Sequence, residues 1–374
     1  MKIGFDAKRA LNNSTGLGNH ARILLIAMMR DFPENDYLLF SPKAKDEFFH
    51  QLQGDFKIIL PETKLQQSFH SLWRSFGINT HLAGNKVDLY HGLSNEIPFE
   101  HRASDIGFVV TIHDLIFLKH TEQYPFVDRQ IYKLKTKYAA KQADKIIAVS
   151  QETKHDLIEM YGVKEEKIVV IYPSVDAAFQ SEVRGPKSGV LQKYNLPSKY
   201  ILNVGSFFPR KNQRTIVEAF DLVKHKIEED LVLIGSNGTT RKEIETLIEK
   251  KNLSQRVKII SGVSNEDLPD VYRLASLFVF PSLYEGFGAP VVEALFSKVP
   301  VIATKGGAIE EAGGKHSLYV NPNSAEEIAD AMIRVLTDEK LKERMIEIGL
   351  THAQTMTDTV FAKKTMNVYR EVLG

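Results

Sequence analysis

The chain has 374 residues, 43% of them hydrophobic and 25% charged, which is the composition of a folded protein of about two domains. Its 48 lysines and arginines nearly balance 47 aspartates and glutamates, and this net charge of +1 argues against a nucleic-acid partner, which needs a basic surface. The chain has no cysteine, which excludes disulfides, thiolate nucleophiles and cysteine-ligated metal sites.

The first nine residues predict a strand and not a signal peptide, because Asp6, Lys8 and Arg9 interrupt their apolar character. No run approaches the roughly 18 apolar residues of a membrane-spanning helix. A chain without cysteine suits a reducing compartment, so we expect a cytoplasmic protein. Peripheral contact with the inner face of the membrane stays open.

Short apolar runs alternate with helical patterns along the chain. Several runs are apolar throughout, which is typical of parallel strands that are covered on both faces. This alternation predicts doubly wound α/β sheets. The predicted strands are residues 2–7, 37–41, 57–60, 87–92, 108–113, 145–150 and 167–172, then 200–206, 231–236, 257–262, 277–282, 299–304 and 317–320.

Residues 173–197 interrupt this alternation with Pro173, Gly185, Pro186, Gly189 and Pro197, and they are the predicted linker. The prediction is two Rossmann-like domains, residues 1–180 and 181–355, that face each other across a cleft. Residues 356–374 are expected to form a helix that packs back on the first domain. Ligands of such sheets bind at the carboxyl ends of the strands, which would open toward the cleft.

A helix predicted at 64–84 places four large apolar residues on one face: Phe69, Leu72, Trp73 and Phe76. Packing of this face on the domain core is favoured over contact with an acceptor or a membrane. A basic stretch follows at Lys133, Lys135, Lys137, Lys141 and Lys145. Here a solvated helix face is slightly favoured over contact with anionic lipid or a pyrophosphate-linked acceptor.

Two features of the first domain are candidate binding residues. Gly16 and Gly18 follow the first strand, where glycines let the backbone approach a ligand closely, although such a pair is more often a simple turn. His113 and Asp114 close the strand at 108–113, and this strand end places them at the predicted cleft. A structural histidine is the alternative interpretation of His113.

In the second domain, Arg210 and Lys211 follow the strand at 200–206. Two adjacent cations at a strand end suit a diphosphate, and they would stabilise the charge on a departing nucleoside diphosphate. A solvated pair of side chains is the alternative.

A turn with two glycines follows the strand that ends at Pro281 and precedes an apolar helix. The backbone N–H groups of Gly286, Phe287 and Gly288 at this helix start suit a phosphate. Glu285 and Glu293 flank them, and carboxylates suit sugar hydroxyls. This pairing suggests a nucleotide sugar, although on the spacing alone a helix cap with one exposed glutamate is the preferred interpretation.

The segment from Phe280 to Leu295 resembles the signature of the retaining glycosyltransferases of family four, which have the GT-B fold. That signature is a glutamate, seven residues and a second glutamate, with Gly-Phe-Gly between them. The resemblance implies that Glu285 contacts hydroxyls of the donor sugar and that Glu293 binds the ribose. It covers essentially the whole chain and is strongest from 201 to 322.

The same resemblance assigns roles to other residues. It implies that Arg210 and Lys211 hold the donor diphosphate, with Ser206 standing where the family commonly has arginine, and that backbone groups near Val263 meet the nucleobase. It places His113 beside the donor sugar and the loop of Gly16 and Gly18 toward the donor phosphates and the acceptor. Asp114 is expected to orient His113 or to bind acceptor hydroxyls. Glu310, after a Gly-Gly pair, matches a glutamate near the cleft, with a helix N-terminal carboxylate as the alternative.

The activity implied is transfer of a hexose, with mannose favoured, from a GDP- or UDP-linked donor to a glycan or polyprenyl-linked acceptor in cell-surface polysaccharide synthesis. No resident cofactor is expected, and the donor site has no Asp-x-Asp metal motif, so the reaction is expected to be metal-independent.

Retention suggests a carboxylate nucleophile, as in retaining glycosidases, but the sequence offers no convincing candidate. We therefore expect same-face substitution, in which the leaving diphosphate takes the proton of the acceptor. A nucleotide-sugar epimerase of the same fold and a non-catalytic nucleotide-sugar-binding module are the alternatives. The glutamate motif argues against the first, and the presence of both His113 and the Arg210–Lys211 pair argues against the second.

Overall fold

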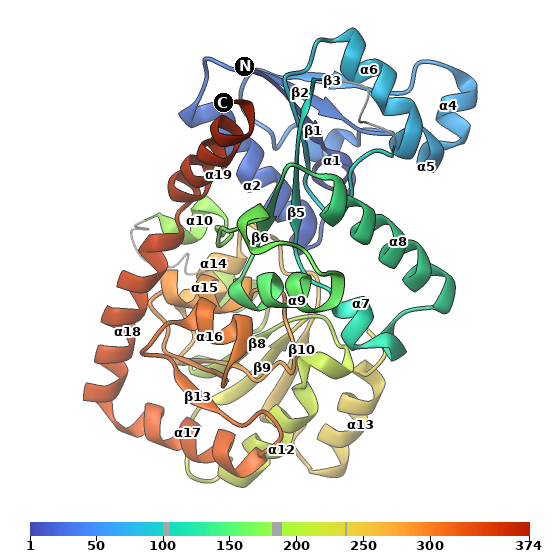
Figure 1. The fold of residues 1–374 in the computed structure, drawn as a ribbon. Coiled ribbons are helices and arrows are strands. Elements are labelled where there is room, and N and C mark those ends of the chain that lie inside the picture. The colour runs from blue at the N-terminus through green and yellow to red at the C-terminus, as the bar shows by residue number, and fades with distance from the viewer. Residues whose placement is uncertain (100–104, 182–188, 236–237) are drawn as a thin grey trace. The chain divides into compact units, whose positions relative to one another are not determined.

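The computed structural model describes residues 1–99, 105–181, 189–235 and 238–374 (Figure 1). The chain forms two compact units, each with its own parallel sheet. Unit 1 consists of Met1–Asp176 and Met356–Gly374, and unit 2 consists of Ala177–Thr355. Of the predicted linker, Gly185 and Pro186 lie outside the described residues.

The sheet of unit 1 has seven strands in the order β3-β2-β1-β4-β5-β6-β7, and each neighbouring pair is parallel. The strands are short and mostly buried, because helices cover both faces of the sheet. All seven strands predicted in this part of the chain are confirmed. They are β1 (Lys2–Asp6), β2 (Asp36–Phe40), β3 (Lys57–Ile59), β4 (Leu89–Gly92), β5 (Gly107–Ile112), β6 (Lys145–Ala148) and β7 (Ile168–Val170).

Helices pack on both faces of this sheet. On one face α19 (Asp358–Leu373) lies along α2 (Gly16–Asp31), so the end of the chain completes the first unit (Figure 1). Phe5 of β1 and Phe361 of α19 belong to the core on this face. The core on the other face includes residues of α8 (Phe126–Gln142) and α9 (Gln151–Tyr161). The remaining α-helices outside the 64–84 segment are α1 (Lys8–Asn12), α3 (Asp46–Phe49) and α7 (Ile116–Lys119).

The segment at 64–84 differs from the single helix predicted for it. A π-helical turn at Trp73–Gly77 separates the short helices α4 (Lys64–Ser68) and α5 (His70–Leu72) from α6 (Ile78–Gly84). Trp73 is buried, but Phe69, Leu72 and Phe76 are 54%, 57% and 46% exposed. The breaks at residue 69 and at the π-turn disrupt the helical register that would align the four side chains. The favoured interpretation, packing on the core, is therefore wrong for these three residues.

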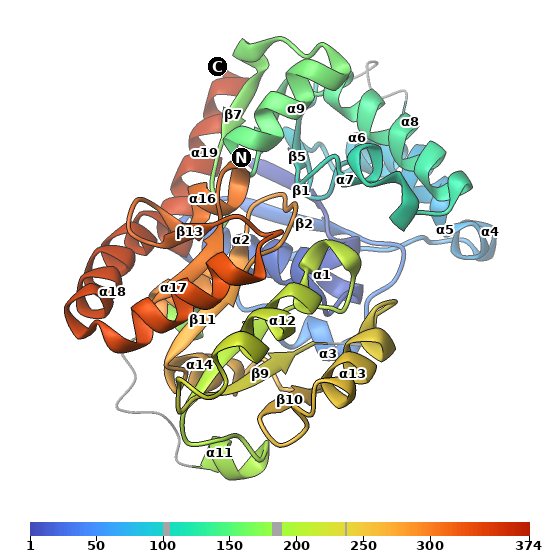
Figure 2. The ribbon, with the colours of Figure 1, turned by 90° about the horizontal axis from the view of Figure 1, so that it is seen from below.

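The sheet of unit 2 has six strands in the order β10-β9-β8-β11-β12-β13, again parallel throughout. Side chains alternate between its faces. Leu277 and Val279 of β11 join the core under α12 (Gln213–Val223) and α17 (Ala325–Thr337), which lie side by side in Figure 2. Phe278 contacts Tyr272 of α14 (Leu268–Arg273) on the other face. The strands, all predicted, are β8 (Tyr200–Val204), β9 (Asp230–Ile234), β10 (Val257–Ile260), β11 (Leu277–Phe280), β12 (Val301–Thr304) and β13 (Leu318–Val320).

The helices of unit 2 follow the strands in the doubly wound pattern. Predicted helices at 213–228 and 239–250 correspond to α12 and α13, which are shorter than expected. Among the described residues, no helix combines the length and the apolar character needed to cross a bilayer. The helices are α10 (Ala177–Gln180), α11 (Gly189–Lys193), α12 (Gln213–Val223), α13 (Arg241–Lys250), α14 (Leu268–Arg273), α15 (Ala289–Phe296), α16 (Gly307–Gly313), α17 (Ala325–Thr337) and α18 (Glu339–Ala353).

Candidate functional site

The strand order of unit 2 brings two charged loops together. β8 and β11 are parallel neighbours, so the loops that leave their carboxyl ends begin side by side. Arg210 and Lys211 lie in a 3-10 turn after β8, and Glu285 lies in the loop after β11. The backbone N–H of Leu283 donates to the carbonyl oxygen of Arg210 at 2.7 Å, which ties the two loops together.

Glu285 is the centre of this charged cluster. Its Oε1 atom lies 2.6 Å from Lys211 Nζ, 2.9 Å from an Arg210 guanidinium nitrogen and 2.6 Å from the Ser282 hydroxyl. Its other oxygen, Oε2, accepts no hydrogen bond from the part of the chain that the structure describes. The carboxylate is therefore anchored through one oxygen and has the second available for a further donor.

Burial and charge act against each other in the cluster. The side chains of Glu285, Lys211 and Arg210 are 12%, 12% and 20% exposed. Burial alone would raise the pKa of Glu285, but Lys211 and Arg210 outweigh it, so the pKa is lowered and the group is ionised. Burial lowers the pKa of Lys211 even though Glu285 opposes this shift. Arg210, Lys211 and Glu285 taken by themselves carry one surplus positive charge, before Glu293 is counted.

Asn212, to which the sequence assigned no role, fixes the turn that carries the two cations. Its backbone is left-handed, with φ of 59°, and its side-chain amide donates to the carbonyl oxygens of Pro281 at 3.1 Å and Pro322 at 2.6 Å. These bonds join the turn to the ends of β11 and β13. Asparagine tolerates this backbone conformation better than most residues, and this is the signal that could have identified it.

Glu293 lies in α15, and its Oε2 atom accepts a hydrogen bond of 2.8 Å from the hydroxyl of Tyr272. Burial, with Glu293 adding to it, raises the pKa of that hydroxyl well above its usual value, so the tyrosine stays a donor. Glu293 also acts electrostatically on Lys211. Both motif glutamates thus act on the same ammonium group, Glu285 by direct contact and Glu293 through its charge. The role of Tyr272 had no signal in the sequence.

The predicted phosphate loop, Gly286, Phe287 and Gly288, directly precedes α15. Gly288 has φ of +118°, a conformation that side-chain-bearing residues avoid, and a Cβ atom there would lie 3.3 Å from that of Ala312. Phe287 is buried. The glycine at 288 is therefore required by the turn into the helix as well as being a candidate ligand contact.

The remaining predicted donor residues of unit 2 lie in loops at the carboxyl ends of other strands. Ser206 follows β8, and its carbonyl oxygen accepts from Gln213 at 3.2 Å. Val263 follows β10, in a loop held by a bond from the Ser264 N–H to the Tyr194 hydroxyl at 3.2 Å. Glu310 accepts a 2.6 Å bond from the Gly306 N–H, which is the helix-capping arrangement offered as its alternative.

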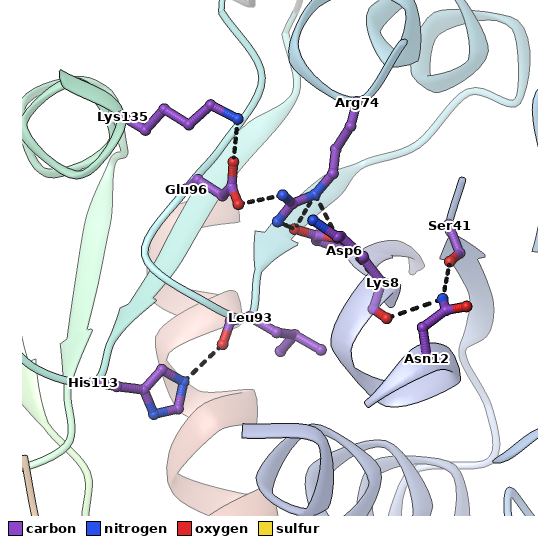
Figure 3. Close-up of polar contacts among 9 residues, drawn as sticks. All are labelled: Asp6, Lys8, Asn12, Ser41, Arg74, Leu93, Glu96, His113 and Lys135. Atoms are coloured by element: carbon purple, nitrogen blue, oxygen red, sulfur yellow. Dashed lines mark hydrogen bonds and ion pairs between the residues drawn. The ribbon is translucent and has the colours of Figure 1, made fainter. Parts of the chain in front are cut away.

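In unit 1, His113 follows β5 and is held from two sides. Its backbone N–H donates to Asn95 at 2.8 Å, and its ring Nε2 lies 2.9 Å from the carbonyl oxygen of Leu93 (Figure 3). A carbonyl oxygen can only accept, so Nε2 carries the proton and Nδ1 presents a lone pair. Nδ1 has no hydrogen-bond partner among the described residues. Asp114, next along, accepts from the Ile116 N–H at 3.1 Å.

Two further imidazoles lie near His113. The ring of His20 packs edge-on against it, with centroids 4.5 Å apart, and the Nε2 atom of His20 is buried without a partner among the described residues. His91 is bonded to Tyr369 and Thr111. Burial lowers the pKa of His113 to about 4 and that of His91 to about 3, and it lowers that of His20 as well. All three rings are therefore neutral near pH 7, and His113 can accept a hydrogen bond from a hydroxyl.

A buried ion network lies beside a pocket of about 480 Å³ in unit 1. Arg74 donates to Asp6 and to Glu96, and Lys135 lies 2.8 Å from the second oxygen of Glu96 (Figure 3). Burial would raise the pKa of Glu96, but Arg74 and Lys135 lower it to about 2. His113 and Arg74 both line this pocket. Sequence reasoning missed the network, although Asp6 at the end of an apolar strand and Arg74 in an apolar stretch were its signals.

The two glycines of the first loop have different surroundings. A Cβ atom at Gly18 would lie 1.9 Å from the carbonyl oxygen of Asn13, so chain packing alone requires glycine there. A Cβ atom at Gly16 would meet nothing within 4 Å. Gly16 begins α2, and of the two glycines it is the one that could carry a side chain without a clash.

Sequence comparisons decide the family. The profile of the glycosyl transferases group 1 matches residues 191–352, and that of glycosyltransferase family 4 matches residues 15–179. The chain belongs to the group 1 glycosyltransferases. This glycosyltransferase is 29% identical over 286 residues to the O-antigen chain mannosyltransferase B of Escherichia coli, an alignment that covers 75% of this chain and 74% of that protein.

Solved structures agree on the GT-B fold of this glycosyltransferase. A glycosyltransferase from Rickettsia africae superposes with a TM-score of 0.77 at 19% identity, over 100% of this chain and 98% of that one. Anabaena HepE in complex with UDP-glucose superposes with a TM-score of 0.76 at 18% identity, over 99% and 100%. Within the described residues, no group of three or more histidines, aspartates or glutamates is arranged to hold a metal ion.

Proposed function

We propose that the chain is a retaining glycosyltransferase that moves a hexose, mannose in preference, from a GDP- or UDP-linked donor to a glycan or polyprenyl-linked acceptor. The observation that carries this proposal is the buried cluster of Arg210, Lys211 and Glu285, with Glu293 close by. The relative from Escherichia coli, named as an O-antigen mannosyltransferase, supports mannose and surface-polysaccharide synthesis. The HepE complex supports a nucleotide-sugar donor.

The charges of the cluster suit a donor diphosphate. Arg210 and Lys211 are largely buried, and hydrogen bonds from charged groups are stronger where water is excluded. A diphosphate beside Arg210 and Lys211 would share them with Glu285. The available Oε2 atom of Glu285 would then accept a hydrogen bond from a hydroxyl of the donor sugar.

The reaction we propose is a same-face substitution. The acceptor oxygen bonds to the anomeric carbon as the bond from that carbon to the diphosphate oxygen breaks, and the diphosphate oxygen takes the acceptor proton. Arg210 and Lys211 stabilise the charge that grows on the leaving group. Glu285 is a poor candidate for a covalent nucleophile, because its Oε1 atom is surrounded by three donors and its pKa is lowered.

We propose that no divalent ion is needed, because the two cations supply the positive charge at the leaving group. In unit 1, the neutral His113 is suited to accept a hydrogen bond from a sugar hydroxyl through Nδ1. It would position that hydroxyl and would not act as a proton donor, since the single N–H of the neutral ring is hydrogen-bonded to the carbonyl oxygen of Leu93.

Turnover with a panel of donors tests the proposal. GDP-mannose, UDP-glucose and UDP-galactose are each incubated with and without a mannose-terminated oligosaccharide, in EDTA and in Mg²⁺. We expect acceptor-dependent release of one nucleoside diphosphate in EDTA, and an α-linked product by NMR. Lys211→Met should abolish turnover, and Lys226→Met, an exposed lysine of the same unit, should not.

Four other results would contradict the proposal. An inverted linkage would overturn same-face substitution, and activity restored only by Mg²⁺ would overturn metal independence. An isomerised donor sugar without acceptor would indicate an epimerase. Donor binding without turnover on any acceptor, including a polyprenyl-linked one, would indicate a binding module.

A further inference from the structure

Helix α8 has an apolar stripe that faces solvent. Val127, Ile131, Leu134 and Tyr138 follow one another at spacings of four, three and four residues, so they lie on one face of the helix. Val127 is 66% exposed, Ile131 45% and Leu134 64%. The residues that α8 buries are small: Thr136, Ala139 and Ala140. Tyr138 packs partly on the core, so the helix presents Val127, Ile131 and Leu134 outward, the reverse of a helix that only packs on a core.

Aromatic rings extend this stripe to the segment at 64–84. Tyr138 contacts Phe99, with ring centroids 4.5 Å apart, and Phe99 stacks on Phe76 at 5.3 Å. Phe76 lies in the π-helical turn that follows α5, whereas Leu72 ends α5 and Phe69 directly precedes it, and all three side chains are exposed. We call these residues together the apolar rim. It consists of Val127, Ile131, Leu134, Tyr138, Phe99, Phe76, Leu72 and Phe69.

The apolar rim borders the pocket of unit 1. Ile131 of the rim lines the pocket together with Tyr132 of α8. On the other side His70 and Ser71 line it, between Phe69 and Leu72 of the rim. The two parts of the rim thus adjoin residues that line one pocket, which Arg74 and Lys135 also line.

A row of cations follows the rim along α8. Lys133, Lys137 and Lys141 repeat at intervals of four, so they form a second stripe beside the apolar one. All three are exposed, and none pairs with a carboxylate of the described residues. Arg129, one turn earlier, stacks on the exposed ring of Phe126 at 5.4 Å. An apolar stripe beside a basic stripe is the pattern of a helix that lies in a lipid interface.

We propose that the apolar rim docks unit 1 on the surface of an anionic bilayer, with α8 lying in the interface. The basic row decides between occupants: a second copy seated face to face would bring like charges together, whereas anionic headgroups neutralise them. Docking would hold the mouth of the pocket at the lipid surface, where a membrane-anchored acceptor is presented. The docking itself involves no donor, so it stands or fails separately from the proposed function.

Co-sedimentation of the full chain with vesicles tests this proposal. One set of vesicles is phosphatidylcholine alone. The other is phosphatidylcholine with about 30% of the anionic lipid phosphatidylglycerol. We expect binding to the anionic vesicles and much weaker binding to neutral ones. Lys133→Gln with Lys137→Gln should weaken binding about thirty-fold, and Ile131→Ser with Leu134→Ser should weaken it about tenfold or more.

Matched controls separate docking from general stickiness. Lys363→Gln with Lys364→Gln removes two exposed lysines from α19 of the same unit, and Leu222→Ser removes a leucine that is 50% exposed on α12. Neither control should change vesicle binding, and each variant should keep the melting temperature of the parent. Sedimentation velocity follows the oligomeric state in parallel.

Three outcomes would overturn the proposal. One is no binding to anionic vesicles by the folded parent chain. Another is equal loss of binding in the rim variants and the controls. The third is a dimer that dissociates on Ile131→Ser with Leu134→Ser while vesicle binding is absent, which would assign the apolar rim to self-association.

Discussion

Replacing Glu285 by glutamine should separate the structural role of this carboxylate from its role toward the donor. In the free protein the change leaves Lys211 and Arg210 without their shared partner, although both are largely buried. Breaking a buried pair in this way costs about 3–5 kcal/mol, and we take about 3 because each side chain keeps some exposure. For a unit of this size the loss corresponds to a fall in melting temperature of roughly 6–12 °C.

Nucleoside diphosphate binding should change in the opposite direction. GDP and UDP carry no transferred hexose, so they lose no hydrogen bond at Glu285, and in the variant the two cations no longer share the Glu285 carboxylate. Calorimetric titration should show about tenfold tighter binding of the preferred diphosphate to the variant, the worth of one charge-assisted hydrogen bond. Turnover of the nucleotide sugar should be lost.

Glu310→Gln is the matched control for this variant, because the carboxylate of Glu310 accepts a backbone N–H and holds no cation of the described residues. It should cost about 1 kcal/mol of stability and leave diphosphate binding unchanged. An unchanged melting temperature for Glu285→Gln, or weaker diphosphate binding, would refute the reasoning about the cluster.

Three further predictions concern unit 1. Burial lowers the pKa values of His113 and His91 in the folded chain, so below about pH 6.5 the unfolded chain binds more protons than the folded one. The stability that the two neutral rings contribute is therefore fully present above that pH. It should be lost as pH falls toward 4, with about 3 kcal/mol from His113 alone, and urea titrations of His113→Asn should lose this part of the dependence. Asp6→Asn should cost about 3 kcal/mol in urea unfolding because it leaves Arg74 half-paired, whereas Asp36→Asn at an exposed strand end should stay within about 0.5 kcal/mol, and equal costs would contradict the network. Gly18→Ala should cost about 1–3 kcal/mol or more through the Asn13 carbonyl, while Gly16→Ala should not destabilise the chain, and a reversed order would contradict the packing described.

The sheets could be predicted from sequence because each strand carries its own signal. Buried parallel strands are short, apolar throughout and separated by helical patterns, so runs such as Phe278–Phe280 are visible without tertiary information. The segment at 64–84 has no comparable local signal for its structure. Its apolar residues repeat as in one helix, but a π-turn shifts the register, and nothing local in the sequence marks that turn.

The site residues were also visible, but their partners were not. Lys211 and Glu285 are 74 residues apart, and their contact depends on β8 and β11 being neighbours, which strand patterns do not establish. Asp6 and Arg74 are 68 residues apart, and their contact likewise depends on how the elements of unit 1 are arranged. The residue type and the strand end thus predict which side chains gather, whereas the hydrogen-bonded pairs require the topology.

Thermal shift with GDP and UDP tests the central claim of the account, that unit 2 holds a nucleoside diphosphate with Glu293 on its ribose. The parent chain is compared with Glu293→Ala and with Glu347→Ala, an exposed glutamate of α18. We expect one of the two nucleotides to raise the melting temperature of the parent and of Glu347→Ala by mass action, and to lose that effect in Glu293→Ala. No shift with either nucleotide, or an equal shift in all three proteins, would contradict it.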